Sequence, residues 1–376
     1  MPDFLFQTPA NLRVGPGCAA EVGPILGGLG ARRVLVVTDM GVVRAGLLDG
    51  VLPALGEAGI ACTVFDGVLA DPPAEVIEAA VEAGRSCKAE AVLGIGGGSP
   101  MDTAKLTAYL LGSGEQLEDI YGIGNAKGRR LPLVLAPTTA GTGSEVTPIA
   151  IVTTGQAEKK GVVSPALFAD WAVLDADLTL GLPPHATAAT GIDAMVHAIE
   201  AYTSRHKKNP LSDMLAREAL RLLAGNIRAA CADGENREAR QAMLLGAMLA
   251  GQSFTNAPVA AVHALAYPIG GLFHVPHGVS NALMLPHVLR FNREAAESLY
   301  AELAPLVGAQ GADGFIAAIE QLCDDVKVPR RLRDVGIGEE DVERLARDAM
   351  NQTRLLVNNP REVGLADARA LYRAAF

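Results

Sequence analysis

The feature that most constrains the fold of this 376-residue chain is a regular alternation of strand-like and helix-like segments in its first half. Apolar, β-branched runs that predict strands occupy residues 32–40, 61–68, 89–99 and 131–145. Helix-like segments lie between them at residues 46–59, 71–87 and 101–113, and another precedes them at 19–30. Because each helix returns the chain to the same edge of the sheet, strands joined in this way pair in parallel. The first half therefore predicts an α/β domain whose parallel sheet is covered on both faces.

The pattern changes after Pro184. Three further segments complete the first half: residues 4–17 predict a short strand or hairpin, and residues 150–155 and 171–178 predict strands. Beyond them, long segments rich in Ala, Leu and Arg have helical periodicity and few β-branched residues. These segments occupy residues 210–232, 236–254, 292–307, 313–326 and 339–350. We therefore predict two domains, an α/β domain over residues 1–183 and a helical domain over residues 184–376.

Composition excludes several classes of protein. Hydrophobic residues make up 49% of the chain and charged residues 20%, as expected of a globular protein. A net charge of −10 with only local basic pairs argues against a nucleic-acid partner. No apolar run reaches the roughly 18 residues that span a bilayer, and the N-terminal segment lacks a signal-peptide pattern, so we expect no membrane association. The five cysteines form no CxxC pair, which fits a protein of the reducing cytoplasm.

Four side chains in the second half have the types and spacing of a metal site. Asp193 and His197 are four residues apart in an apolar, Ala-rich segment, so on a helix both leave the same face. An ordinary i,i+4 surface pair is the alternative, but polar side chains on so apolar a helix need a partner. His263 and His277 lie in a second segment, broken by proline and glycine, and can supply two more ligands. One carboxylate and three imidazoles suit Fe²⁺ or Zn²⁺.

Glycines and hydroxyls at the ends of two predicted strands have the composition of a phosphate-binding site. Gly96, Gly97, Gly98 and Ser99 lie where a strand passes into a helix, and the backbone N–H groups there favour an anion. For a glycine triplet alone, a tight turn is an equally good explanation. A second group of hydrogen-bond donors follows the next predicted strand, at Thr138, Thr139, Thr142 and Ser144. Since open α/β sheets bind ligands at the carboxyl ends of their strands, the two groups together favour a nucleotide.

Asp39 follows the first buried strand and is the third part of this pattern. A carboxylate at this position can accept hydrogen bonds from the ribose hydroxyls of adenosine and repel a 2′-phosphate, which favours NAD over NADP. Capping the following helix is the alternative role for this residue. The three parts together predict a dinucleotide site.

These residues closely resemble the iron-containing (group III) alcohol dehydrogenase family. The family's signatures occur in its own order and spacing from about Leu5 to Tyr372, as GGGSPMDTAK, PTTAGTGSE, DADLTLGLPP, the Asp193 and His197 pair, and HALAYPIGGLFHVPHGVSNALMLPHVLRFN. The resemblance implies a Rossmann-like dinucleotide domain followed by an all-helical metal-binding domain, as in the dehydroquinate synthase-like superfamily, with the active site in the cleft between them. It also implies a homodimer or a larger homo-oligomer.

The resemblance assigns roles to individual positions. The metal-ligand positions of the family match Asp193, His197, His263 and His277. The cofactor positions match Asp39, Gly97, Gly98, Ser99, Asp102, Thr138, Thr139, Thr142, Ser144, Lys160 and Leu178. Lys160 corresponds to a lysine that contacts the cofactor ribose. The implied cofactors are NAD and Fe²⁺, with Zn²⁺ as the alternative metal.

Two positions depart from the family pattern. Some members have a second histidine four residues after the third ligand, where this chain has Tyr267. His274, elsewhere in the same loop, is therefore our candidate for a catalytic proton relay. Ile149 replaces a polar residue that is common near the nicotinamide, which makes that wall apolar. Phe254 is expected either in a pocket wall or in the core, and His287 is interpreted as a packed helix residue.

The expected reaction is reversible hydride transfer between an alcohol and NAD, with the metal as a Lewis acid on the alcohol oxygen. The substrate partner is then a small alcohol or aldehyde. Within the superfamily, a maleylacetate-reductase-like, glycerol-dehydrogenase-like or hydroxyacid–oxoacid transhydrogenase activity is the alternative. A non-catalytic NAD- or metal-binding module is the alternative of a different class. The complete set of one aspartate and three histidines argues against the metal-independent members.

Overall fold

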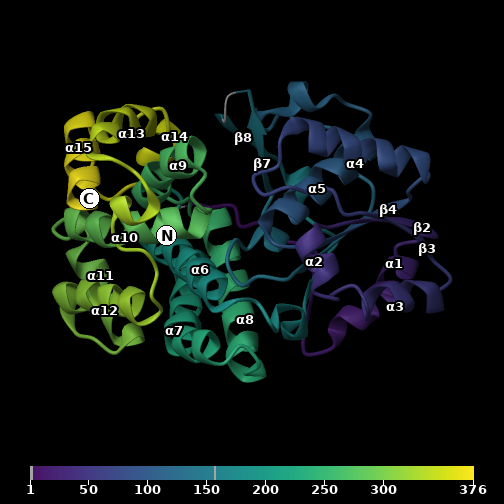
Figure 1. Cartoon of the computed structure of the whole chain (residues 1–376), viewed down its shortest axis with the longest axis horizontal. Helices are drawn as coiled ribbons and strands as arrows, with labels where there is room; N and C mark the ends of the chain where they lie inside the picture. The colour runs from purple at the N-terminus through teal and green to yellow at the C-terminus, as the bar shows by residue number, and fades with distance from the viewer. Residues whose placement is uncertain (1–2, 156–157) are drawn as a thin grey trace. The chain divides into compact units, whose positions relative to one another are not determined.

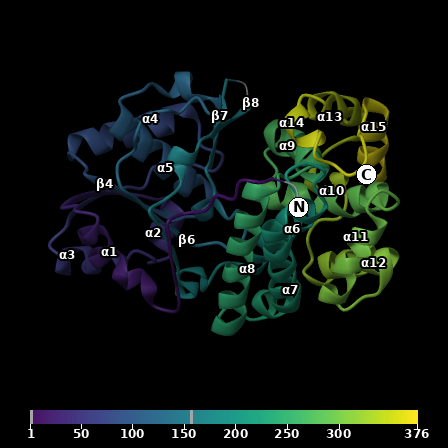
Figure 2. The same cartoon turned by 180° about the vertical axis from the view of Figure 1, so that it is seen from behind.

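The computed structural model describes residues 3–155 and 158–376, and the chain divides into two compact units (Figures 1 and 2). One unit contains Gln7–Gly181. The other contains Leu182–Phe376 together with residues 3–6. Among the described residues, no helix has both the length and the apolar character that crossing a membrane requires.

A six-stranded sheet forms the centre of the first unit, and every one of its strand pairings is parallel. In spatial order the strands are β1 (Asn11–Val14), β9 (Trp171–Leu174), β6 (Leu133–Pro137), β4 (Ala91–Gly96), β2 (Arg33–Val37) and β3 (Ala61–Phe65). The parallel sheet predicted from the alternating segments is therefore confirmed. The segment 4–17, for which a strand or hairpin was expected, supplies one edge strand and no hairpin, because β1 pairs only with β9.

Helices cover both faces of this sheet, as Figure 1 shows. On one face lie α1 (Val22–Gly28) and α3 (Val51–Glu57), and on the other α4 (Ala74–Ser86) and α5 (Gly98–Ser113), while the short α2 (Met40–Arg44) follows β2. The central strands are apolar on both sides because they are buried on both sides. Along β2, Val34 and Val36 pack in the cluster that includes α1 and α3, whereas Leu35 and Val37 pack in the cluster that includes α5.

A second, three-stranded sheet completes the first unit. It contains β5 (Gly122–Ile123), β8 (Glu158–Val163) and β7 (Ile149–Thr154), with β7 and β8 antiparallel. The strand expected at residues 150–155 is thus present as β7, outside the parallel sheet. The expected elements did not include β8, because EKKGVV has no alternating apolar pattern, nor β5, which is only two residues long.

The second unit is helical. Its helices are α6 (Pro184–Thr203), α7 (Pro210–Ala232), α8 (Arg237–Asn256), α9 (Ala261–Phe273), α10 (His277–Asn292), α11 (Glu297–Leu303), α12 (Gly311–Asp325), α13 (Val342–Ala349), α14 (Thr353–Leu356) and α15 (Leu365–Ala374). The helix expected at residues 292–307 is shorter than predicted: Asn292 ends α10, residues 293–296 form turns, and Ala304–Val307 form a 3₁₀ turn after α11.

Helix α6 is the central element of this unit. It is buried along almost its whole length and packs against α7, α8 and α10. Small residues permit the close approach: a Cβ on Gly278 of α10 would lie 2.3 Å from the carbonyl oxygen of Ala189 on α6. The start of α7 is fixed by Asn209, whose side chain caps the helix before Pro210. Side chains on α6 are therefore held on a rigid element surrounded by other helices.

Candidate metal centre and cofactor loops

The four predicted ligand residues lie together on three helices of the second unit. Asp193 and His197 are one turn apart on α6, His263 is in the first turn of α9, and His277 is the first residue of α10. One ligand atom of each side chain lies within 4.8 Å of the ligand atoms of the other three. From Oδ1 of Asp193 the distance is 3.6 Å to Nε2 of His277 and 3.9 Å to Nε2 of His263. Ligand atoms about 2.0–2.2 Å from one ion fit this grouping after a small contraction.

Burial and charge keep these groups in the protonation states that a metal requires. Burial alone would raise the pKa of Asp193, but the three nearby histidines and the Asn281 amide lower it below its ordinary value. Burial, together with His197 and His277, lowers the pKa of His263 well below its ordinary value. Asp193 is therefore a carboxylate and His263 a neutral imidazole at neutral pH, which are the forms that coordinate a cation.

Asn281 of α10 shows that the cluster fits a positive ion. Its amide nitrogen lies 2.5 Å from Oδ1 of Asp193, 3.3 Å from Nε2 of His263 and 3.2 Å from Nε2 of His277. Three electron-pair donors thus converge on one NH₂ group. This group can donate only two hydrogen bonds, whereas a divalent cation at the same place can bind all three donors. The residues present therefore fit the metal that the ligand types predict.

Two aromatic side chains border the cluster. The ring of Phe254 on α8 stacks on the imidazole of His197, with centroids 4.3 Å apart. The ring of Tyr267 on α9 lies 5.9 Å from that of His277. Asp193, His197 and His263 are buried, whereas His277 is 31% exposed and both aromatic residues are half-buried. The accessible side of the cluster is therefore the side of His277, Phe254 and Tyr267.

His274 and His287 lie outside the cluster of ligand residues. His274 is exposed and ends α9 in the left-handed conformation, with φ of 56°. Its role as a proton relay stays a prediction. His287, farther along α10, has its pKa lowered to about 4 by burial and by two nearby arginines, so it is a neutral packed side chain at pH 7.

Sequence reasoning missed Glu200, which lies three residues after His197 on α6. This carboxylate is buried and contacts Nδ1 of His263 at 2.6 Å. Burial raises the pKa of Glu200 to about 7, while hydrogen bonds from two backbone N–H groups oppose that rise. One signal for it was present in the sequence: an acidic residue in an otherwise apolar helix, on the same side as His197, needs a polar partner.

In the α/β unit, the glycine turn and the threonine loop lie against each other. Gly97 caps α5 and Gly98 is its first residue. A Cβ on Gly98 would lie 3.0 Å from the methyl group of Thr142, and one on Gly97 would lie 3.5 Å from the hydroxyl oxygen of Thr139. The backbone N–H of Thr138 donates to the carbonyl oxygen of Gly96 at 2.9 Å. The two predicted phosphate-binding segments therefore form one surface at the carboxyl ends of β4 and β6.

A buried polar network supports this surface from below. Asp102 of α5 accepts hydrogen bonds from the hydroxyl of Ser144 at 2.6 Å and from the backbone N–H of Ile151 at 2.9 Å. Lys105, which has no exposed surface, donates to Ser144 at 2.7 Å and to the carbonyl oxygen of Ile149 at 2.7 Å. Burial lowers the pKa of Lys105 and raises that of Asp102. The network fixes the threonine loop and β7 to the first helical turns of α5.

The other predicted cofactor residues have varied surroundings. Asp39 caps α2 through Oδ1, which accepts from the N–H groups of Gly41 and Val42 at 2.7 and 3.0 Å. The helix-capping role, which was the alternative to binding ribose, is therefore present. Lys160 of β8 lies with Nζ 5.5 Å from the ring centroid of Tyr121. Ser99 accepts a hydrogen bond from the backbone N–H of Asp71 at 3.2 Å. The side chain of Leu178 packs in a hydrophobic cluster.

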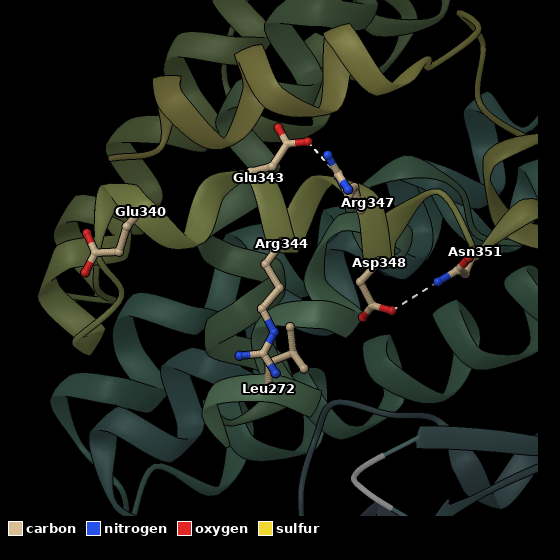
Figure 3. A pocket seen from close by; sticks show the side chains of 7 residues that line it. All are labelled: Leu272, Glu340, Glu343, Arg344, Arg347, Asp348 and Asn351. Carbon is tan, nitrogen blue, oxygen red and sulfur yellow. Dashed lines mark hydrogen bonds and ion pairs between the residues drawn. The ribbon is translucent and has the colours of Figure 1, made fainter.

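A groove elsewhere in the helical unit is unrelated to the predicted site residues (Figure 3). Leu272 and residues of the α13 region line it. Two pairs of side chains interact along it: Glu343 forms an ion pair with Arg347, and Asn351 donates to Asp348. No titratable or metal-binding residue of the cluster on α6, α9 and α10 contributes to this groove.

The α/β unit has loops with the composition of a nucleotide site, and the helical unit has a candidate divalent-metal centre. Together these features are typical of a metal-dependent oxidoreductase that uses a nucleotide cofactor. A family profile for "Iron-containing alcohol dehydrogenase" matches residues 9–176, and one for "Fe-containing alcohol dehydrogenase family, C-terminal" matches residues 187–376. The chain therefore belongs to the iron-containing alcohol dehydrogenase family, an oxidoreductase family. The family and fold expected from the sequence motifs are confirmed.

The relatives and solved structures described here are similar to this protein over nearly the whole length of the chain. Long-chain-alcohol dehydrogenase 1 of Geobacillus thermodenitrificans (strain NG80-2) is 41% identical, covering 98% of this chain and 95% of the relative. The 1,3-propanediol dehydrogenase of Klebsiella pneumoniae is 37% identical, covering 99% of both. The crystal structure of a 1,3-propanediol oxidoreductase has a TM-score of 0.97 at 36% identity and full coverage of both chains. A sulfoacetaldehyde reductase from Bifidobacterium kashiwanohense, solved in complex with NAD⁺, has a TM-score of 0.92 at 30% identity, covering 100% and 99%.

Proposed function

We propose that this alcohol dehydrogenase catalyses reversible hydride transfer between an alcohol and NAD, producing the corresponding aldehyde or ketone, with Fe²⁺ or Zn²⁺ at Asp193, His197, His263 and His277. The convergence of one carboxylate and three imidazoles within 4.8 Å carries the proposal. The bound metal would supply Lewis acidity that stabilises negative charge on the alcohol oxygen. Two of the relatives named above are dehydrogenases of a long-chain alcohol and of a diol, and one similar structure is that of an aldehyde reductase, which supports this reaction class.

NAD is the proposed cofactor because three features of the α/β unit suit it. The glycine turn and threonine loop present backbone N–H groups and hydroxyls suited to a pyrophosphate. Asp39 uses only Oδ1 for its helix cap, which leaves Oδ2 for ribose hydroxyls. The polar network of Asp102, Lys105 and Ser144 holds the threonine loop in place. A similar structure solved with NAD⁺ adds support.

The direct test is NADH formation from a panel of alcohols, followed by absorbance, with the purified protein. We expect steady turnover that requires added NAD. A transhydrogenase would instead retain nicotinamide through purification and release little NADH, so the cofactor content of the purified protein separates the two reactions.

All five cysteines, Cys18, Cys62, Cys87, Cys231 and Cys323, are free, which supports our proposal that the protein works in the cytoplasm.

We propose that Phe254 selects apolar alcohols. Its half-buried ring lies against His197 on the accessible side of the cluster, where a substrate chain would pack. For Phe254→Ala we expect kcat/KM for 1-hexanol to fall about 10- to 100-fold, because burial of an aromatic side chain contributes about 1.5–3 kcal/mol. The value for ethanol, which is too short to use this contact, should change less than about threefold.

The matched variant for this prediction is Phe254→Leu, which keeps an apolar side chain beside His197. It should retain most of the preference for 1-hexanol over ethanol. Metal content must be measured in both variants, since Phe254 also supports a ligand ring. An equal loss of activity on both alcohols, at unchanged metal content, would show that Phe254 does not select the substrate.

A further inference from the structure

Glu200 occupies a buried position from which it reaches both a metal-ligand residue and the start of α9. It is 4% exposed. Its Oε1 accepts from the backbone N–H of Val262 at 2.6 Å, and its Oε2 accepts from that of Ala260 at 2.9 Å. Helix α9 has no capping side chain at its own N-cap, Ala260, so Glu200 satisfies N–H groups that the helix start would otherwise leave unpaired. The position of this carboxylate is thereby fixed.

The same carboxylate determines which nitrogen of His263 carries the proton. Oε2 of Glu200 lies 2.6 Å from Nδ1 of His263. Two backbone N–H groups donate to Glu200, and these hydrogen bonds favour its ionised form. An ionised carboxylate oxygen only accepts hydrogen bonds, so Nδ1 carries the proton and donates it to Glu200. The lone pair of Nε2 then points toward Asp193 and His277, where the ligand atoms converge.

Asn281 supports the same tautomer from the opposite side of the ring. Its amide nitrogen lies 3.3 Å from Nε2 of His263 and donates to Oδ1 of Asp193. The reverse orientation of the amide would place its oxygen against the Asp193 carboxylate oxygen, which is repulsive. An N–H donor beside Nε2 requires an unprotonated nitrogen there. Groups on both sides of the imidazole therefore select one tautomer.

We propose that Glu200 is a positioning residue of the metal centre, which holds His263 in the Nδ1-protonated tautomer and presents Nε2 to the ion. The inference rests on the metal dependence proposed above. Hydrogen-bonding partners of this kind fix the ring orientation and tautomer of a histidine ligand, and their loss weakens metal binding by about 10- to 100-fold.

Glu200→Gln tests the proposal. The glutamine side chain has nearly the same shape, but it offers one acceptor oxygen to three N–H donors and places its own NH₂ group against one of them. We expect the Kd for Zn²⁺, measured by chelator competition on the apoprotein, to rise about 10- to 100-fold. In the wild-type apoprotein, ¹⁵N NMR of histidine-labelled protein should show His263 protonated at Nδ1, with assignment from His263→Gln. In Glu200→Gln that signal should shift toward the Nε2-protonated form.

Ser204→Ala is the matched control. Ser204 also connects the end of α6 to the segment before α9, since its hydroxyl donates to the carbonyl oxygen of Pro258 at 2.8 Å, but it does not contact His263. We expect its Zn²⁺ affinity to stay within about twofold of wild type, because it leaves the ligand tautomer unchanged. Equal weakening in both variants would mean that Glu200 acts only by holding the segment, and would overturn the proposal.

The remaining outcomes are also decisive. Wild-type affinity in Glu200→Gln, or a wild-type His263 protonated at Nε2, would overturn this inference and leave the proposed function intact. A wild-type protein that binds no divalent cation would overturn the proposed function and this inference with it. If Glu200→Gln does not fold, the tautomer of His263 in the wild-type apoprotein decides the question.

Discussion

Replacing His277 with glutamine should remove the metal and lower kcat/KM for alcohol oxidation by about 10³-fold or more, whereas the same replacement at His287 should leave both nearly unchanged. His277 supplies one of the converging ligand atoms, 3.6 Å from the carboxylate of Asp193. Glutamine cannot offer the ring nitrogen at that place. Loss of Lewis acidity removes several kcal/mol of stabilisation from charge that develops on the alcohol oxygen, and about 4 kcal/mol corresponds to the expected factor.

His287 is a matched control because it lies on the same helix, α10, and is a neutral imidazole at pH 7. Its replacement tests what the loss of a half-buried histidine does to the fold alone. Both variants should be compared by metal content, kcat/KM and thermal midpoint. If His277→Gln keeps its metal and its activity, or if His287→Gln loses both to the same degree, the assignment of His277 as a ligand is wrong.

Replacing Asp39 with serine should shift the cofactor preference toward NADP by about 100-fold, measured as the ratio of kcat/KM for NADP to that for NAD. Two like charges about 5–6 Å apart repel by about 3 kcal/mol at an effective dielectric constant near 20, and removing the carboxylate removes this repulsion of a 2′-phosphate. The same change removes an acceptor for ribose hydroxyls, so KM for NAD should rise.

Serine is the informative substitution because Asp39 also caps α2. A serine hydroxyl can accept from the N–H groups of Gly41 and Val42, so the thermal midpoint should change little. Asp39→Ala, which removes both the charge and the cap, should show the same change of preference together with a loss of stability of about 1 kcal/mol. An unchanged NADP to NAD ratio in both variants would leave Asp39 with its capping role alone.

The parallel sheet could be predicted because its strands are strongly β-branched and separated by helices, which leaves few alternatives. Strand order could not, because the pairing of β1 with β9 joins residues about 160 positions apart in the chain. The strand β8 was missed because Lys159, Lys160 and Gly161 interrupt any apolar pattern. Its pairing with β7 supplies what its own sequence does not.

In the metal centre, the four ligand residues were predictable because their side-chain types and their i,i+4 spacing on an apolar helix point to one kind of chemistry. The groups that orient them were not. The sequence indicates that Glu200 needs a polar partner, but it does not show that Glu200 and Asn281 contact His263, which lies on a different helix from each of them. In the cofactor loops, Lys105 was missed because a lysine with no exposed surface is unusual.

Metal removal and reconstitution tests the central claim most directly. Protein purified without oxygen should contain close to one equivalent of Fe²⁺ or Zn²⁺ per chain, about what one cluster of four ligand residues holds. Complete chelation should abolish NADH formation from alcohols, and adding back either ion should restore it. The decisive reading is the rate after chelation, at a metal content verified to be negligible. We expect it to fall to background, and full activity in the metal-free protein would contradict the proposed mechanism.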